Sequence, residues 1–563
     1  MRLSQQDISN DCLSNETNET NESELCEEAI ELEMLVSKMK DLMVKHVNEG
    51  RKPGANVVDY KSPEELQELI DLNLEYNGIN VEGLIPLIQN ILHYSVNTWN
   101  PGFMDKLYAS TNPVGIISEM LITLLNANSH VYHVSPVLTI IENVVSKKLA
   151  KLLGMGEKSG GITCPGGSFS NQLAMITARN HMFPETKTKG YFNFGKRLLV
   201  FTSSAGHYSI EKTAMTLGLG TDNVIKVPCD KKGRMRVDEL ELLIKKSIQQ
   251  GDIPFFINAT AGTTVLGAFD PLQEIGKIAK QYNIWFHIDG SWGGSLVFSE
   301  KHKHLIDGTN LANTLVINPH KMLGTPLQCS FLLAQNSQIF AQLNSLDAEY
   351  LFHKEENDLG EGTVGCGRKP DAVKLFIGWK IFGIEGYQKR IEHAFEMSKY
   401  LLKKLKNHKK FKMVLEKPES LQVCFWYIPE GIEECWLNEE YKEYNNLKKI
   451  IIINNGQVKN CENLNNNQEN YYKKYKLFKY KLSKITKEIH LKIRRNGKYL
   501  FDYSPITLEN IELPLFFRIV TNSPAINEKF LDGLLEQIEI VGKSVTETLN
   551  NNNDEINGIC NRY

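Results

Sequence analysis

Short apolar runs recur along the middle of the chain, and each is long enough for one buried β-strand. They lie at 198–202, 224–227, 255–259, 284–288, 315–317 and 331–334. Two intervening segments, 237–248 and 272–282, place apolar residues three and four apart, which is the spacing of an amphipathic helix. Buried strands that alternate with helices predict an α/β fold, with a mainly parallel central sheet covered on both faces.

The flanking regions predict other kinds of structure. Residues 1–25 are polar and predict a disordered tail, whereas 26–105 predicts a helical segment. In that segment, apolar side chains at helical spacing include Leu32, Leu35, Val36 and Met39.

Composition then divides the rest of the chain. We place a large domain at 106–390 and a small C-terminal α+β domain at 391–563. An Asn-, Lys- and Tyr-rich insert at about 433–487 interrupts the small domain, and we expect it to be a surface excursion without chemistry.

Two reactive side chains stand just past predicted strands. Asp289 directly follows the run at 284–288, and Lys321 lies four residues after the run at 315–317. Ligands of parallel α/β sheets bind at the carboxyl ends of strands, so the topology can bring both to one rim. An amine can bind an aldehyde cofactor covalently, and a carboxylate can keep a pyridine nitrogen protonated. The pair therefore indicates pyridoxal phosphate (PLP), although a lone lysine at a strand end is more often solvated.

Further polar motifs also lie next to predicted strands. In CPGGSFSN at 164–171, glycines let the backbone approach an anion, and Ser168 or Ser170 could cap a following helix. The amides of such a helix N-terminus favour a phosphate. His207 could stack on a flat cofactor, and Thr264 could donate a hydroxyl group. Taken alone, each of these motifs is equally typical of an ordinary turn with no cofactor.

Composition and charge exclude several classes of protein. The chain has 563 residues and a net charge of −3, so nothing indicates nucleic acid or an anionic membrane as its partner. Ten scattered cysteines show neither a metal-ligand spacing nor a disulfide framework, and we expect no metal. No apolar stretch is long enough to span a bilayer, and no apolar signal segment follows Met1, which predicts a cytoplasmic protein.

Together the motifs resemble the group II PLP-dependent amino-acid decarboxylases, a family that includes glutamate, cysteine sulfinate and aromatic amino acid decarboxylases. The most specific strings are ATAGTT at 259–264 and NPHKM at 318–322. The likeness spans roughly 97–542 apart from the insert, and is nearest to the glutamate and cysteine sulfinate branch, especially its fungal members. It implies the aspartate-aminotransferase-type fold (fold type I), PLP as cofactor and a homodimer that the N-terminal helical segment helps to join.

The resemblance also implies roles for individual residues. Lys321 would bind PLP covalently, and Asp289 would pair with its ring nitrogen. His207 would stack on one ring face, and Ser291 would take the other face, where the family usually has alanine. The remaining implied cofactor residues are Gly167, Ser168, Thr264, Asn318 and His320.

Substrate recognition partly departs from the family pattern. Arg518 matches the arginine that grips a substrate carboxylate in glutamate decarboxylases, and its planar fork suits that task. Lys106, Leu107 and Tyr108 stand where those enzymes have Gln-Leu-Ser, in a segment that shapes the substrate pocket. Glutamate therefore cannot simply be carried over, and Lys106 could face either an acidic side chain or solvent.

A second departure lies in the family's mobile loop, here 350–368. This segment is shorter than usual, and its tip at 355–362 lacks the tyrosine that helps to protonate the product. Protonation must then come from another group, for which His207 is a candidate.

The predicted function is PLP-dependent decarboxylation of a small acidic amino acid, namely glutamate, aspartate or cysteine sulfinate, to its amine. Two alternatives remain open. One is an enzyme that diverts the reaction to an aldehyde, and the other is an inactive regulatory paralogue. The joint presence of Lys321, Asp289, His207 and Arg518 argues against the inactive paralogue.

Overall fold

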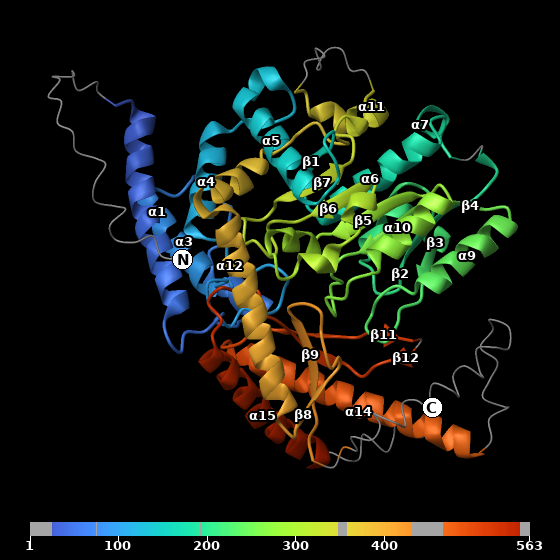
Figure 1. Ribbon diagram of the computed structural model, residues 1–563. Helices are drawn as coiled ribbons and strands as arrows, with labels where there is room; N and C mark the ends of the chain where they lie inside the picture. Colours follow the sequence, from blue (N-terminus) through green and yellow to red (C-terminus); the bar gives the residue numbers. More distant parts are fainter. Residues whose placement is uncertain are drawn as a thin grey trace. The chain divides into compact units, whose positions relative to one another are not determined.

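The computed structural model describes residues 25–74, 76–191, 194–346, 357–430, 432, 466–509 and 511–551. The predicted tail, except its last residue, and the first part of the predicted insert, 433–465, lie outside these residues. The chain forms two compact units, one over residues 1–100 and the other over 101–563, and each is described by itself (Figure 1).

The first unit is helical. Its helices are α1 (Glu27–Arg51), α2 (Pro63–Leu69) and α3 (Val81–Tyr94). Helix α2 begins with a capping box, in which Ser62 and Glu65 satisfy each other's backbone N–H groups. Along α1, Leu32 and Val36 are exposed, whereas Leu35 and Met39 are half-buried, so none of the four apolar residues whose spacing predicts this helix is fully buried.

The centre of the second unit is a seven-stranded sheet with strand order β1-β7-β6-β5-β4-β2-β3. Its strands are β1 (Gly160–Cys164), β2 (Leu198–Ser203), β3 (Val224–Val227), β4 (Ile253–Thr260), β5 (Trp285–Gly290), β6 (Thr314–Ile317) and β7 (Ser330–Ala334). Strands β2 to β6 pair in parallel, and β7 runs antiparallel between β6 and β1. Every strand predicted from an apolar run is present, and the mainly parallel sheet is confirmed.

Strand β1 is not among the strands predicted from apolar runs. Two of its residues are glycines, which weaken a strand signal. Gly161 is needed here because a Cβ at this position would lie 2.2 Å from the carbonyl oxygen of Leu332 on the paired strand β7. The close contact between the backbones of β1 and β7 therefore explains why this strand contains glycine in place of the apolar residues that predict strands.

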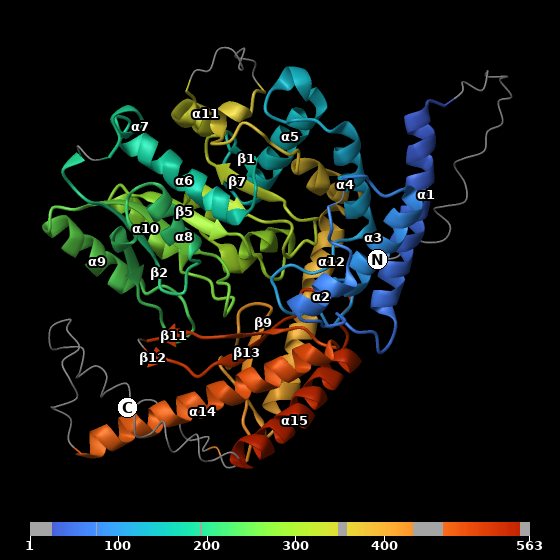
Figure 2. The ribbon, with the colours of Figure 1, turned by 180° about the vertical axis from the view of Figure 1, so that it is seen from behind.

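Alternate residues of the strands enter two different hydrophobic cores. Leu199 and Phe201 pack into one core, and Leu198 and Val200 pack into the other, because neighbouring side chains of a strand point to opposite faces. Helices supply apolar residues to both cores, so the sheet is covered on both faces, as Figures 1 and 2 show. The first core takes residues from α5 (Pro136–Leu152), α9 (Val237–Gln249) and α10 (Leu272–Gln281); the second takes them from α6 (Gly167–Met182) and α8 (Ser209–Thr216).

Helix α12 (Ala372–Lys406) connects this region to a smaller sheet. The helix breaks at Gly383, whose φ of 60° favours glycine. Before and just after the break α12 packs into the first core, whereas Leu401 and Leu405 pack into a separate core under the small sheet. Ile391 and Ala394 also belong to the first core, so the change from one core to the other lies after the predicted division at residue 390.

The small sheet has four antiparallel strands in the order β10-β13-β9-β8. Helices α14 (Asn466–Asn496) and α15 (Glu528–Asn551) pack against it. Its strands are β8 (Phe411–Met413), β9 (Gln422–Tyr427), β10 (Asp502–Ser504) and β13 (Phe516–Val520). The remaining elements of this unit are α4 (Pro113–Leu125), α7 (Thr186–Lys189), α11 (Ile339–Asn344), the pair β11 (Thr507–Leu508) and β12 (Ile511–Glu512), and several short 3-10 turns.

The described end of the predicted insert is a packed helix. In α14, Tyr475, Phe478, Leu482 and Ile485 are buried. The expectation of a surface excursion is therefore wrong for this part of the insert. These apolar side chains are three and four residues apart, but the lysines between them obscure the stripe.

Candidate active site

The carboxyl ends of the parallel strands meet at one edge of the large sheet. Asp289 is the penultimate residue of β5, and Lys321 lies four residues after the end of the adjacent strand β6. Their charges interact, so the topology brings the two predicted residues together. His207 follows β2 at the same edge and also interacts with both charges.

Asp289 lies in a site built for a carboxylate. The side chain is buried, its Oδ1 accepts the backbone N–H of Ser291 at 3.1 Å, and its Oδ2 accepts Nδ2–H of Asn171 at 3.0 Å. Burial alone raises the pKa of Asp289, but the charge of Lys321 and these two hydrogen bonds outweigh it and hold the pKa below its ordinary value. Asp289 is therefore ionised at neutral pH.

Lys321 has the opposite balance. Burial lowers the pKa of its ammonium group, and the negative charge of Asp289 only partly opposes that shift. A lowered pKa increases the fraction of neutral amine, which is the nucleophilic form. The backbone carbonyl of Lys321 accepts Nδ2–H of Asn522 at 3.0 Å, which ties this turn to the chain after β13.

His207 is half-buried and neutral. Its Nδ1 accepts the backbone N–H of Ser209 at 3.2 Å, so the ring proton is on Nε2. Burial lowers the pKa of His207, Asp289 opposes this effect, and Lys321 adds to it. The ring therefore has one N–H donor at neutral pH and little tendency to gain a second proton.

The glycine-rich segment forms the start of α6, but its serines do not cap the helix. The N-cap is Gly166, with a φ of 93°, and no side chain caps the helix. Ser168 and Ser170 both lie inside the first turn, and Ser170 instead contacts Ser330 at 2.8 Å. The predicted serine cap is wrong, because a glycine with positive φ already turns the chain into the helix.

Gly167 lies directly against two other predicted residues. A Cβ at this position would lie 2.6 Å from Oγ of Ser291 and 2.7 Å from Nδ2 of Asn318. Asn318 is buried, and within the described residues its Oδ1 has no hydrogen-bond partner. The helix N-terminus, Ser291 and Asn318 thus form one polar cluster, beside which Ser168 is exposed.

His320 and Thr264 contact the backbone of neighbouring segments. Nδ1 of His320 lies 2.6 Å from the carbonyl oxygen of Cys329, and burial lowers the pKa of the ring to about 4. His320 is therefore neutral. Thr264 is half-buried, and its carbonyl oxygen accepts Nη1–H of Arg518 at 3.1 Å.

Arg518 extends from the middle of the small sheet and is buried. Besides Thr264, its Nη2 donates to the carbonyl oxygen of Asp105 at 2.9 Å and to Oδ2 of Asp502 at 3.0 Å. Its Nε has no partner in the part of the chain that the structure describes. Three of the five guanidinium donors are thus in use, and two can still bind another acceptor.

Lys106 faces two carboxylates. Its side chain is 50% exposed, and Nζ lies 3.0 Å from Oδ1 of Asp105 and 3.2 Å from Oδ2 of Asp502. Burial alone lowers the pKa of Lys106, but the two carboxylates outweigh it and raise the pKa. Of its neighbours, Leu107 is buried and Tyr108 is half-buried beside Phe103, with 5.4 Å between the ring centroids.

Three polar residues that were not predicted from the sequence join these parts. Asn522 is buried, and its Nδ2 donates to the carbonyl oxygens of Leu107 and Lys321, at 2.9 and 3.0 Å. Asn171 and His287 lie behind Asp289. A signal for His287 was present, because it is two residues before Asp289 and so shares a face of an otherwise apolar strand.

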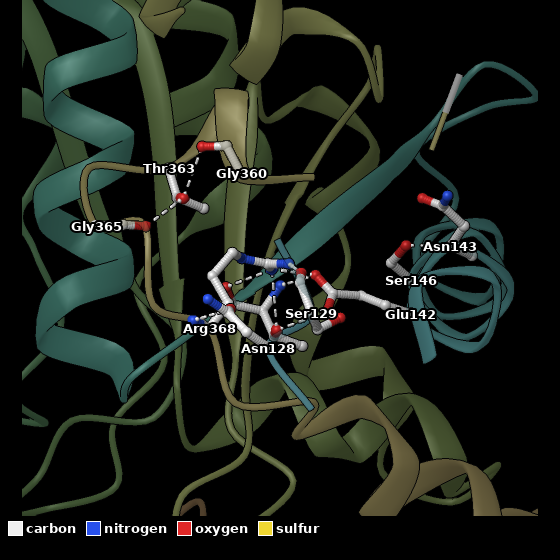
Figure 3. A network of polar contacts seen from close by, with 10 residues as sticks. Asn128, Ser129, Glu142, Asn143, Ser146, Gly360, Thr363, Gly365 and Arg368 are labelled. Atoms are coloured by element: carbon white, nitrogen blue, oxygen red, sulfur yellow. Dashed lines mark hydrogen bonds and ion pairs between the residues drawn. The ribbon is translucent and has the colours of Figure 1, made fainter. Parts of the chain in front are cut away.

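The tip of the predicted mobile loop lies partly outside the described residues, since 347–356 is not described. The segment that follows it is fixed by a buried polar network (Figure 3). Arg368 forms an ion pair with Glu142 and donates to the carbonyl oxygen of Ser129 at 2.6 Å. Glu142 also accepts the backbone N–H of Thr163 at 2.8 Å, so the network ties this segment to α5 and β1.

The structure also bears on metal binding and membrane insertion. Within the described ranges, no group of His, Cys, Asp and Glu side chains is arranged to hold a metal ion. None of the helices described here combines the length and the apolar content needed to cross a membrane.

The chain is similar to known proteins along most of its length. The pyridoxal-dependent decarboxylase conserved domain matches residues 63–428. An L-aspartate decarboxylase of Metarhizium robertsii is 46% identical over 393 residues, which cover 69% of this chain and 78% of that protein. The crystal structure of mouse CSAD matches with a TM-score of 0.79 and 32% identity, over 91% of this chain and 99% of that one.

A more distant structure shares the fold alone. Catharanthus roseus tryptophan decarboxylase, crystallised with L-tryptophan, matches with a TM-score of 0.74 and 19% identity, over 93% of this chain and all of that one (100%). The mouse and plant matches confirm the predicted fold class, fold type I.

Proposed function

The chain belongs to the pyridoxal-dependent decarboxylase family, and we propose that its substrate is a small acidic amino acid. The predictions of the family, of PLP as cofactor and of a carboxy-lyase are confirmed by the family match and the decarboxylase relative. One observation carries the acidic substrate: the 46% identity to an L-aspartate decarboxylase. Aspartate is therefore our first candidate, ahead of glutamate and cysteine sulfinate.

The residues at the sheet edge fit the proposed cofactor. When bound, PLP supplies an aldehyde that combines with amines and a ring that accepts electrons from the substrate's alpha carbon. We assign the aldehyde to Lys321, whose lowered pKa favours the neutral amine, and the ring nitrogen to ionised Asp289. The fit is supported by Gly167, where a Cβ would fill the space beside Ser291 and Asn318.

Other cofactor contacts follow from their places around this cluster. We assign the phosphate to the N-terminus of α6 with Ser168 and Asn318, because first-turn amides and polar side chains favour an anion. His207 and Ser291 are assigned to the two ring faces. His320 and Thr264 are proposed as neighbours of the cofactor, although the structure shows both in contact with protein backbone.

The substrate's alpha-carboxylate is assigned to Arg518. Its remaining donors, Nε–H and one Nη1–H, are available, while Thr264, Asp105 and Asp502 hold the guanidinium in place. A fixed carboxylate fixes the direction of the bond that breaks, so the role of Arg518 is to orient as well as to bind. We propose that the substrate's distal acid group lies beside Lys106, Leu107 and Tyr108.

Protonation of the product carbon is assigned to His207. The neutral ring carries its proton on Nε2, because Nδ1 is occupied by the backbone N–H of Ser209. A His207→Gln variant keeps a polar group but has no titrating ring. It should release carbon dioxide and accumulate less amine than wild type, and equal yields would contradict this role.

We also propose a homodimer in the cytosol. Helices α4 and α5 expose apolar side chains that a second copy of the chain would cover, and these are Ile117, Leu121, Leu124, Leu125, Val137, Ile140 and Val144. The cysteines in the described residues are free thiols, which agrees with a reducing compartment. Light scattering on the protein as it elutes from a size-exclusion column measures its mass, and the mass of a single chain would contradict the homodimer.

A substrate panel tests the proposed specificity. The holoenzyme is assayed for amine formation from aspartate, glutamate, cysteine sulfinate, tryptophan and leucine at equal concentrations. We expect the acidic substrates to have the highest specificity constants, with aspartate first. A preference for tryptophan or leucine would contradict the proposed acidic substrate but not the membership of the decarboxylase family.

A further inference from the structure

A continuous chain of hydrogen bonds leads through the protein interior to Asp289. It begins at Trp285, passes through Thr314, His287 and Asn171, and ends on the carboxylate. These residues come from β5, β6 and α6, and all are buried. The proposed function assigns roles only to Asp289, at the end of this chain.

The hydrogens in this chain have one consistent arrangement. Trp285 Nε1 can only donate, and it lies 3.0 Å from Oγ1 of Thr314. Thr314 Oγ1 can then give its own hydrogen to Nδ1 of His287, 2.9 Å away. In that arrangement the ring proton of His287 is on Nε2.

The other end of the chain requires the same arrangement. An ionised Asp289 can only accept, so Asn171 must turn its Nδ2 toward Oδ2 of Asp289, at 3.0 Å. Asn171 Oδ1 then faces Nε2 of His287 at 3.0 Å and needs a donor there. The ionised carboxylate thus places the single ring hydrogen of His287 on Nε2, and Nδ1 accepts from Thr314.

Both amide hydrogens of Asn171 are in use. The second Nδ2–H donates to Oγ of Ser209 at 2.9 Å, so the amide cannot turn over without losing several bonds. A protonated Asp289 gains less from Asn171, because a hydrogen bond to a neutral carboxyl group is weaker than one to a carboxylate. The network thus stabilises the charged form of the carboxylate.

We propose that Asn171 and His287 are positioning residues that keep Asp289 ionised and directed at the cofactor's ring nitrogen, and that Thr314 supports this tautomer of His287 by donating to Nδ1. The proposal rests on the role given to Asp289 in the proposed function. Burial lowers the pKa of His287 to about 4, which agrees with a neutral ring. Lys321 and His207 are the other titratable groups that act on Asp289, and neither bonds to this network.

The test follows the ring nitrogen directly. Apo-protein is loaded with pyridoxal phosphate labelled with ¹⁵N in the ring, and the nitrogen shift reports its protonation, while titration gives the cofactor dissociation constant. The variants are Asn171→Leu and His287→Phe, which remove the polar atoms at similar volume. His287→Gln is the rescue variant, because its amide can still donate to Asn171.

The far end of the chain supplies a milder pair of variants. Thr314→Val removes the hydroxyl with little change of shape, and Thr314→Ser restores it. Thr139→Val is the matched control, because it removes a hydroxyl that is also buried but donates to the carbonyl oxygen of Pro136 in α5. These variants keep the proposal testable if the changes nearer Asp289 prevent folding.

We expect Asn171→Leu and His287→Phe to weaken cofactor affinity about tenfold or more and to shift the nitrogen toward its deprotonated form. Thr314→Val should move both quantities in the same direction, whereas His287→Gln, Thr314→Ser and Thr139→Val should stay within about threefold of wild type. Folded variants with wild-type affinity and a protonated nitrogen would overturn the proposal.

Two further measurements separate this proposal from the role of Asp289 itself. If Asp289→Asn leaves the nitrogen protonated, the assignment of Asp289 fails, whatever the network does. If Asp289→Asn deprotonates the nitrogen and the network variants do not, only the network proposal fails. In wild-type apo-protein labelled with ¹⁵N-histidine, His287 should carry its proton on Nε2, and an Nδ1 proton would overturn the proposal without any variant.

Discussion

Lys106 and Arg518 share one charge cluster, so their removal should affect substrates differently. Lys106 and Arg518 carry two positive charges, Asp105 and Asp502 carry two negative charges, and the sum is zero. Lys106→Ala and Arg518→Ala each leave a net charge of −1, but only Lys106 lies on the side proposed for the distal acid, so only its loss should weaken acidic substrates more than neutral ones. Arg518→Ala removes the proposed site for the alpha-carboxylate, which every amino acid carries.

The size of each effect follows from burial. Arg518 is buried, and a hydrogen bond to a charged group is worth about 1.5–3 kcal/mol, so Arg518→Ala should lower kcat/KM by roughly 10- to 100-fold for all substrates. Lys106 is half exposed, and solvent screening reduces its effect to about 1 kcal/mol, or roughly fivefold, for acidic substrates alone. Each variant leaves Asp502 one cationic partner, so neither leaves its charge unpaired.

The assay is the ratio of kcat/KM for aspartate to that for a neutral amino acid of similar size. We expect this ratio to fall about fivefold in Lys106→Ala and to stay unchanged in Arg518→Ala, although both constants fall there. Lys106→Gln is the control for the lost side-chain volume and should behave like Lys106→Ala. An unchanged ratio in both Lys106 variants would refute the electrostatic reasoning and return neutral substrates as candidates.

The remaining predictions concern cofactor binding and stability. Lys321→Ala should lose turnover and the visible absorbance of the bound cofactor, and a spectrum like that of wild type would contradict its role. Glu142→Gln should lower the free energy of unfolding by about 3–5 kcal/mol in urea titrations, because it leaves Arg368 buried without its ion pair. Breaking an exposed ion pair should lower the free energy of unfolding by less than about 1 kcal/mol. His287 and His320 have pKa values lowered from 6.5 to about 4, so the unfolded chain binds more protons between these values. Stability should therefore fall as pH drops from about 6.5 toward 4, by up to about 1.4 kcal/mol per pH unit for each histidine, and a flat profile in that range would contradict these shifts.

Strong apolar runs made the large sheet predictable. The runs at 198–202 and 255–259 became β2 and β4 with shifts of one or two residues at their ends, because these strands are buried on both faces. The position of Lys321 relative to Asp289 also followed from the sequence, since adjacent parallel strands end at the same edge. The apolar runs and the parallel arrangement of the strands were therefore sufficient to predict these features.

Contacts between distant segments were not predictable in this way. Asn522 joins Leu107 and Lys321, which are hundreds of residues apart in sequence, and nothing in its local pattern indicates this. The pairing of Lys106 with Asp502 has the same origin, because it depends on the packing of the small sheet. The apolar face of α14 was not predicted for a different reason, namely that most residues of this helix are polar and hide the helical spacing of its apolar residues.

The most direct test of the central claim is the stoichiometry of products from L-aspartate. Holoenzyme is supplied with carboxyl-labelled aspartate, and carbon dioxide, amine, aldehyde and hydrogen peroxide are measured together over the same time course. We predict equal amounts of carbon dioxide and the decarboxylated amine, without aldehyde or peroxide. Carbon dioxide accompanied by aldehyde and peroxide, or no release of carbon dioxide from any acidic amino acid, would contradict the account.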